Sequence, residues 1–153
     1  MIAVSKILVP VDFSLGSKLV VEYAVALAQT LKASVTLLHV RELPGSMSSI
    51  VPGSDNARDG EKAHAFAQER LDLLCAETRK HTDVEMRTLV HQGSPIQEII
   101  ALGRSGTFDM VVMGTHGRTG LQQVLMGSVA EAVVRRGTFP VLTIHLPAVS
   151  SRA

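Results

Sequence analysis

The chain alternates between short apolar runs rich in β-branched residues and longer segments in which apolar residues recur every three or four positions. Apolar runs of about four to eight residues are typical of strands that are buried on both faces of a parallel sheet. The sequence therefore predicts five such strands, over residues 5–12, 33–40, 84–91, 108–113 and 139–145.

Helical periodicity lies between the strands and predicts one helix in each connection. In the first helix, over residues 15–31, an apolar face is expected where Leu19, Tyr23, Leu27 and Leu31 are spaced four apart, with Ala24 and Ala28 beside them. A second helix is predicted over residues 60–80, and it includes the only cysteine, Cys75, for which we expect a packing role. Alternating strands and helices with short connections predict an α/β fold with a parallel sheet and helices on both faces.

The remaining two helices carry recognisable start signals. The third begins with Ser94 as a capping serine, Pro95 at the first helical position and Gln97 placed to complete a capping box. The fourth is predicted over residues 127–136, with Val129, Val133 and Val134 facing inward.

The stretch 41–59 is rich in Gly, Pro, Ser and Asn and predicts a long loop. Loops longer than about 12–15 residues are uncommon inside compact domains unless they are functional or disordered. This loop is therefore either a lid or a disordered excursion, and the sequence leaves both alternatives open.

Composition narrows the class of protein. With 46% apolar and 19% charged residues among 153, the chain is expected to form one soluble globular domain rather than a disordered segment. No apolar run approaches the roughly 18 residues of a membrane span, and no export signal is recognisable, so a cytoplasmic location is expected. A net charge of +1 and 3% aromatic residues argue against a nucleic-acid partner.

The most distinctive motif follows the fourth predicted strand. Gly114 and Gly117 permit positive φ angles and let the backbone approach an anion, because glycine has no Cβ atom. Gly127 and Ser128 then open the last helix, whose first-turn amides and dipole favour phosphate groups. A glycine-rich turn between a strand and a helix also occurs without any ligand, and that alternative stays open here.

Further candidate residues lie beside this motif. His116 and Arg118, within the loop, are placed to meet phosphates or sugar hydroxyls. Asp12, at the end of the first strand, is a candidate partner for a ribose or an adenine edge, although an Asp there is also an ordinary residue at a helix start. Val40 could offer its backbone to a purine. Neither Gly-x-x-x-x-Gly-Lys-[Ser/Thr] nor Gly-x-Gly-x-x-Gly follows the first strand.

Over almost its whole length the chain resembles the universal stress proteins, specifically their ATP-binding branch. Gly114, Gly117, Gly127 and Ser128 match the family motif of Gly, two residues, Gly, nine residues, Gly, then Ser or Thr. The resemblance implies an open, Rossmann-like, five-stranded parallel sheet in the order 3-2-1-4-5, similar to adenine nucleotide alpha hydrolases. It also implies a single domain over residues 1–147 and a short tail over 148–153.

The resemblance further implies which residues surround an ATP molecule. Adenine and ribose are expected near Pro10, Val11, Asp12 and Val40, and the ribose-phosphate path near Met113, Gly114, Gly117, Gly127, Ser128 and Val129. Any Mg²⁺ or Mn²⁺ is expected to be carried by the nucleotide phosphates, since no His, Asp or Glu cluster suggests a dedicated metal site. A homodimer is expected through the last strand, at Val141, Leu142, Thr143 and Ile144.

The leading functional hypothesis is an ATP-binding regulatory protein of the stress response with at most slow hydrolysis. A second is an interaction module that binds AMP or no nucleotide. A third is a slow ATPase, for which His116 is the only candidate base near the expected phosphates. No Ser-His-Asp or Cys-His grouping supports nucleophilic catalysis.

Overall fold

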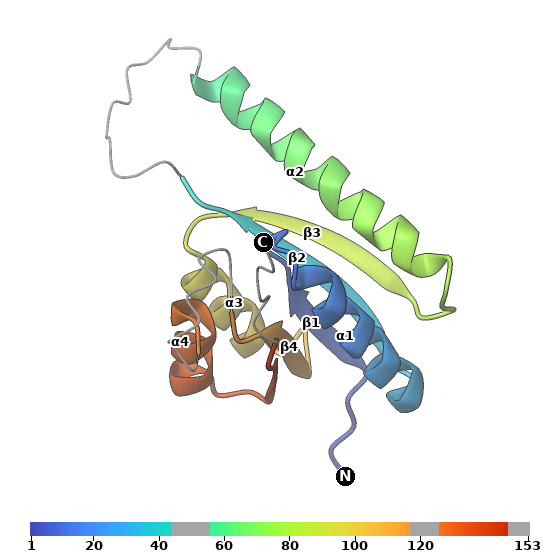
Figure 1. Ribbon diagram of the computed structural model, residues 1–153. Helices are drawn as coiled ribbons and strands as arrows, with labels where there is room; N and C mark the ends of the chain where they lie inside the picture. Colours follow the sequence, from blue (N-terminus) through green and yellow to red (C-terminus); the bar gives the residue numbers. More distant parts are fainter. Residues whose placement is uncertain (44–55, 117–125, 147–153) are drawn as a thin grey trace, which may run out of the picture.

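A computed structural model describes residues 1–43, 56–116 and 126–146 of the chain. Strands and helices alternate along the chain, as the periodicity predicts (Figure 1). The strands are β1 (Lys6–Pro10), β2 (Ser34–Arg41), β3 (Met86–Gln92), β4 (Met110–Gly114) and β5 (Val141–Ile144). The helices are α1 (Ser17–Leu31), α2 (Asn56–Arg79), α3 (Pro95–Arg104) and α4 (Ser128–Arg136).

The five strands form one parallel sheet in the order β3-β2-β1-β4-β5, which confirms the expected fold class. The chain first winds from β1 outward to β3 and then crosses back to place β4 on the other side of β1. Strand order therefore reverses between β1 and β4. In open parallel sheets a ligand crevice is expected outside the carboxyl ends of the strands at such a reversal.

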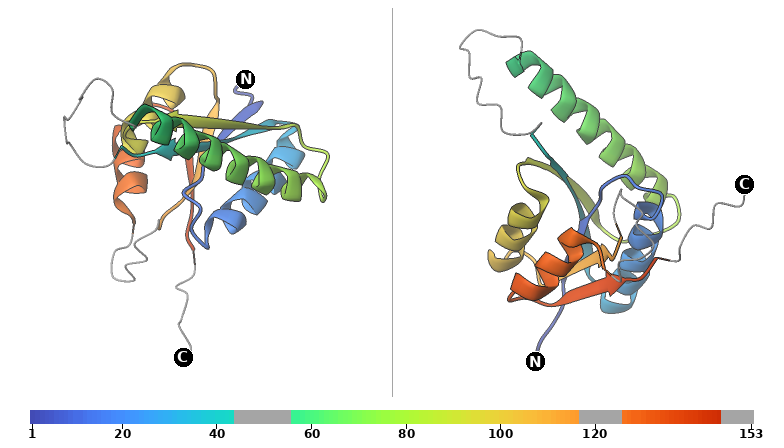
Figure 2. Two further views of the ribbon diagram at one scale, coloured as in Figure 1. Left: turned by 90° about the horizontal axis from the view of Figure 1, so that it is seen from above. Right: turned by 60° about the vertical axis from the view of Figure 1, so that its left-hand side comes forward.

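The sheet lies between two helical layers, with α1 and α2 on one face and α3 and α4 on the other (Figure 2). Each layer packs against its own apolar cluster. The cluster under α1 and α2 includes Ile7, Val9 and Leu71, and the cluster under α3 and α4 includes Leu8 and Ile99. Successive residues of β1 thus point to opposite faces, and both faces are buried, which explains its unbroken apolar run.

The buried face of α1 agrees with the prediction at Ala24 and Ala28 and differs at two of the larger residues. Tyr23 and Leu31 are exposed, at 54% and 40%, while Val20 and Ala24 are buried against the sheet. Small and β-branched side chains allow the helix to approach the sheet closely, so the larger residues on the next stripe are turned outward. The same correction applies to α4, where Val134 is exposed and Ala130 is buried beside Val133.

Several predicted boundaries also move. β1 ends at Pro10, so Asp12 lies in the following loop, and Gly114 is the last residue of β4 rather than the first residue of a turn. The predicted loop 41–59 is shorter at both ends, because Arg41 belongs to β2 and α2 begins at Asn56. Residues 44–55 lie outside the described part, so the choice between a lid and a disordered excursion stays open. No helix in the described ranges is long and apolar enough to cross a membrane.

The start of α3 is only partly as predicted. Ser94 is the N-cap, with extended backbone angles, and Pro95 takes the first turn, but the serine side chain makes no capping hydrogen bond. The first turn is instead closed by the backbone, where the Glu98 N–H donates to the Ser94 carbonyl at 3.0 Å.

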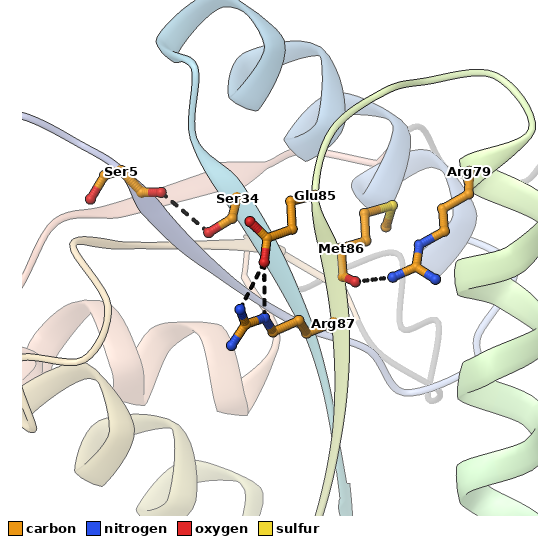
Figure 3. A network of polar contacts seen from close by, with 6 residues as sticks. All are labelled: Ser5, Ser34, Arg79, Glu85, Met86 and Arg87. Atoms are coloured by element: carbon orange, nitrogen blue, oxygen red, sulfur yellow. Dashed lines mark hydrogen bonds and ion pairs between the residues drawn. The ribbon is translucent and has the colours of Figure 1, made fainter.

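Polar contacts fasten the amino ends of the strands (Figure 3). The Ser34 hydroxyl donates to the Ser5 carbonyl at 3.3 Å, and the Arg79 guanidinium donates to the Met86 carbonyl. Asp109, directly before β4, adds three hydrogen bonds at this end of β1: its Oδ2 accepts the Ser5 N–H, the Ser5 hydroxyl and the Lys6 N–H, each at 2.9 Å. These hydrogen bonds, led by that of the Ser5 backbone, lower the pKa of Asp109. The amino ends of the strands are therefore held together by structural contacts.

Candidate functional site

A cavity of about 670 Å³ lies at the carboxyl ends of β1, β2 and β4. Its volume is in the range of small-molecule sites in proteins, about 300–1,000 Å³. The strand ends contribute Pro10, Val40 and Met113, and the start of α4 contributes Ser128 and Val129. The cavity therefore occupies the place where the reversal of strand order predicts a ligand crevice.

The loop after β1 is held in the cavity wall by Asp12. Asp12 Oδ1 accepts the Ser14 N–H at 3.0 Å and the Ser17 hydroxyl at 2.9 Å, and Ser17 is the first residue of α1. These bonds correspond to the helix-start role weighed above. Asp12 also lines the cavity, so the same side chain organises the loop and faces the space where a ligand would bind.

Aromatic and cationic side chains pack around Phe13 in the loop after β1. The ring centroids of Phe13 and His39 are 4.4 Å apart, and His39 Nδ1 lies 2.8 Å from the Val11 carbonyl oxygen. On the Phe13 ring lies the guanidinium of Arg70, with its Cζ 4.2 Å from the ring centroid. Phe13 has a φ of 60°, an uncommon conformation for a bulky residue, which the neighbouring contacts must maintain.

Gly114 does not use the positive φ that glycine permits. Among the glycines of the described ranges, positive φ angles occur at Gly93 and Gly106, not at Gly114. A Cβ atom at Gly114 would lie 3.2 Å from Val20 and 3.3 Å from Leu146, closer than ordinary van der Waals contact. Glycine thus lets β4 pass close to two side chains at the cavity wall.

The first turn of α4 opens into the cavity. Gly127 is its N-cap, with φ −66° and ψ 157°, and its N–H donates to the Thr115 carbonyl, which ties the helix start to the end of β4. Amides of a first helical turn have no acceptor within the helix, and they carry the positive end of the dipole. Ser128 and Val129 thus bring donors to the cavity wall, as a site for anionic oxygens requires.

Two histidines meet beside this end of the cavity. Thr115 Oγ1 lies 3.0 Å from His116 Nδ1 and 3.4 Å from His145 Nδ1, and the two imidazole rings are 5.5 Å apart in an edge-on arrangement. Thr115 is buried and joins β4 to β5, since its N–H donates to the Ile144 carbonyl at 3.0 Å. Within the described ranges there is no group of three or more His, Cys, Asp or Glu side chains that could hold a metal ion.

The structure brings most of the predicted site residues to one cavity. Those that line it are Pro10, Val11, Asp12, Val40, Met113, Gly114, His116, Gly127, Ser128 and Val129. Gly117 and Arg118 lie outside the described residues, so their predicted contacts stay predictions. This clustering shows where these residues meet and leaves open which of them contact a ligand.

Sequence reasoning missed the contribution of α2 and of His39. Ala63, Phe66, Ala67 and Arg70 all line the cavity. These four residues are spaced at helical intervals, but nothing in the sequence indicated that α2 runs past the carboxyl ends of its neighbouring strands. His39 is buried within an apolar strand, and a polar residue in such a place is the signal that could have been used.

Fold and cavity together define a doubly wound α/β protein with a ligand crevice at the reversal of its strand order. The family model described as "Universal stress protein family" matches residues 3–145. The chain therefore belongs to the universal stress protein family, as its motif suggested.

Sequence relatives agree with this assignment. Universal stress protein MJ0577 of Methanocaldococcus jannaschii is 30% identical over 152 residues, which cover 91% of this chain and 93% of the relative. Universal stress protein YxiE of Bacillus subtilis is also 30% identical, over 92% of this chain and 99% of its own length. The match thus extends over nearly the whole of each relative.

Solved structures show the same fold. The structure of MJ0577 is similar with a TM-score of 0.78 and 26% identity, and covers 93% of this chain and 96% of its own. Two more distant universal stress proteins were solved with nucleotides. One, in complex with cAMP, has a TM-score of 0.69 and 20% identity over 94% of this chain and 98% of its own. The other, from Archaeoglobus fulgidus in complex with dAMP, has a TM-score of 0.56 and 18% identity over 94% and 99%.

Proposed function

We propose that this universal stress protein binds ATP in the cavity at the carboxyl ends of β1, β2 and β4, and acts as a cytoplasmic regulator whose bound nucleotide changes its conformation or its choice of partner. The observation that carries the proposal is the first turn of α4, which opens into a cavity of about 670 Å³ beside the strand reversal. A nucleotide needs a donor-rich end and an apolar slot, and this cavity offers both.

The phosphate end of the proposed site is the start of α4. Amide donors at Ser128 and Val129, together with the Ser128 hydroxyl, suit phosphoryl oxygens because they add hydrogen bonds to the favourable field of the helix dipole. His116 and Thr115 lie at the same end. Mg²⁺ or Mn²⁺ would be ligated there chiefly by the phosphates, which supply the oxygen ligands that these hard cations prefer.

The base end of the proposed site lies between β1 and β2. Val11, Leu38 and Met113 are buried apolar residues that also line the cavity. An apolar slot of this kind fits the faces of a purine, while Val40 provides backbone groups at the end of β2 for the edge of the ring. Asp12 then faces the ribose in this arrangement.

The choice of ATP rests on this chain's own residues. Relatives in complex with cAMP and dAMP share 20% and 18% identity with this chain, a likeness that concerns the fold. The motif from Gly114 to Ser128 and the helix start behind it are what favour a polyphosphate. A monophosphate would use only part of that donor set.

Hydrolysis is proposed to be slow. A hydrolase needs a base or a side chain that orients the attacking water. His116 is the candidate at the phosphate end, and it is engaged with the Thr115 hydroxyl at 3.0 Å. The proposed function therefore depends on binding rather than turnover.

A homodimer through β5 is part of the proposal. β5 is an edge strand, it pairs only with β4 in the described sheet, and Leu142 on it is 39% exposed. Exposed strand edges with apolar side chains favour pairing with another copy. The domain proposed to dimerise spans residues 1–147, with 148–153 as a tail.

Two measurements test the proposal. Mass spectrometry of the ligand released from purified, denatured protein is expected to detect an adenine nucleotide. Calorimetric titration is expected to give tighter binding of ATP than of AMP, because the additional phosphates reach the first turn of α4. Equal affinities would favour a monophosphate site, and no binding of either would favour an interaction module without a nucleotide.

A further inference from the structure

Helix α2 contacts the loop after β1 through Arg70, whose guanidinium stacks on the Phe13 ring. α2 runs antiparallel to β3, and its first turns extend past the carboxyl ends of β2 and β3 (Figure 1). Arg70, in the second half of α2, lines the cavity and comes from a different element than the residues of the phosphate motif. Its guanidinium is held between two aromatic rings, with Cζ at 4.2 Å from the Phe13 centroid and 5.8 Å from the Phe66 centroid.

The partners of Arg70 are aromatic rather than acidic. Within the described ranges its guanidinium makes no hydrogen bond or ion pair, so the stacking contact is what fixes its position. Arginine suits this role better than lysine, because the planar guanidinium can lie flat on a ring.

Phe13 transmits this contact to Asp12. Phe13 has a φ of 60°, and its ring contacts both the Arg70 guanidinium and the His39 ring. Such a conformation persists in a bulky residue only when surrounding contacts maintain it. Phe13 lies between Asp12 and Ser14, so its backbone angles determine where the Ser14 N–H, which donates to Asp12 Oδ1 at 3.0 Å, lies relative to the carboxylate.

We propose that Arg70 is a positioning residue, which clamps Phe13 and thereby holds Asp12 in the orientation that accepts a ribose hydroxyl. This inference rests on the proposed function, since it assumes that a nucleotide occupies the cavity. It adds α2 to the binding machinery and explains why a cation at this end of the cavity stacks on a ring instead of pairing with an acid. In this role Arg70 acts through Asp12 without touching the ligand itself.

The test is a double-mutant cycle read with two ligands, ATP and 2′,3′-dideoxy-ATP, by calorimetric titration of the full chain. The ratio of their dissociation constants reports the hydroxyl contact. Arg70→Met is expected to reduce the preference for ATP about two- to fivefold, the range of an exposed cation–π contact. In an Asp12→Ala background the same substitution is expected to have no further effect, because the two residues act as one unit.

Two more variants separate positioning from other roles. Arg70→Lys keeps the charge but loses the flat stacking, so it is expected to behave like Arg70→Met. Arg87→Met is the matched control, since Arg87 pairs with Glu85 at 2.8 Å on β3 and does not line the cavity. The control is expected to leave the ligand ratio unchanged, and thermal unfolding of every variant checks that the fold is retained.

The outcomes are distinguishable. An unchanged ligand ratio in Arg70→Met overturns the positioning role while ATP binding itself stands. An equal loss from Arg70→Met with and without Asp12 overturns it too, because Arg70 would then contact the ligand directly. Retained affinity in Arg70→Lys would assign the effect to charge alone and also contradict the proposal. Failure of the unaltered protein to bind either ligand refutes the proposed function instead.

Discussion

The start of α4 offers the sharpest test of the phosphate site, through the substitution Gly127→Asp. Gly127 is the N-cap of α4 with φ −66°, an angle that any residue can adopt. Aspartate is a favoured N-cap, so the fold is expected to be retained, with a change of only a few tenths of a kcal/mol relative to glycine. The same carboxylate would point at the first-turn amides and compete with a phosphate for them.

The size of the binding loss follows from Coulomb's law. An N-cap carboxylate reaches the amides of the first turn, which would place it about 4–5 Å from a phosphate bound there. At an effective dielectric constant of about 20, each pair of unit charges at that distance repels by about 3–4 kcal/mol. The dissociation constant for ATP is therefore expected to rise about a hundred- to a thousandfold.

Calorimetric titration of Gly127→Asp beside Gly127→Asn isolates the charge. Asparagine has nearly the same shape and caps helices equally well, so it is expected to weaken ATP binding much less. Raising the salt concentration to 1 M should narrow the gap between the two variants, because the Debye length falls to about 3 Å. Equal ATP affinities of the two variants at low salt would refute the assignment of the phosphates to α4.

The remaining predictions concern the ribose, catalysis, stability and assembly. Asp12→Ala is expected to weaken ATP binding by about 1–2 kcal/mol in calorimetry, because a hydrogen bond to the ribose would be lost. If only the stability changed, Asp12 would have no role beyond the start of α1. His116→Ala is expected to leave the slow release of phosphate unchanged, and a clear fall in the rate would make the imidazole part of the chemistry. Asp109→Asn is expected to lower the free energy of unfolding at pH 7 by about 0.5–1.5 kcal/mol, a figure reduced for solvent exposure. Folding lowers the pKa of Asp109, so this contribution to stability is present above the unfolded pKa of about 3.9 and is lost as the pH falls through the folded pKa of Asp109. Urea unfolding of the two proteins should therefore give equal free energies of unfolding in acid. Leu142→Arg is expected to shift the protein from dimer to monomer in analytical ultracentrifugation, and a monomeric parent protein would contradict the proposed β5 interface.

Much of the fold was predictable because its signals are local. Five unbroken apolar runs indicated strands buried on both faces, and the segments between them had helical periodicity. The strand order entered through the motif from Gly114 to Ser128, which identified the family, and the structure confirms it. The motif also located one wall of the cavity correctly, since Gly114, Gly127 and Ser128 all line it.

Other features could not be predicted, because they depend on which residues meet across the fold. The predicted apolar face of α1 included Tyr23 and Leu31, which are exposed, whereas Val20, which was not predicted, is buried against the sheet. Gly114 was singled out because glycine permits a positive φ and the approach of an anion, and nothing in the sequence indicated that it packs closely against Val20 and Leu146. Both features depend on packing, which involves at least two elements, whereas periodicity describes a single element.

The sequence by itself thus determined the class of fold, the family and the position of the candidate phosphate loop, since each of these is carried by local pattern and spacing. Only the tertiary structure decided the other half of the site. Arg70 and His39 come from α2 and β2, far from the motif along the chain, and they meet Phe13 because the parallel sheet brings the ends of its strands to one edge. Contacts between distant segments leave no periodic signal, so the support behind Asp12 became visible only in the folded chain.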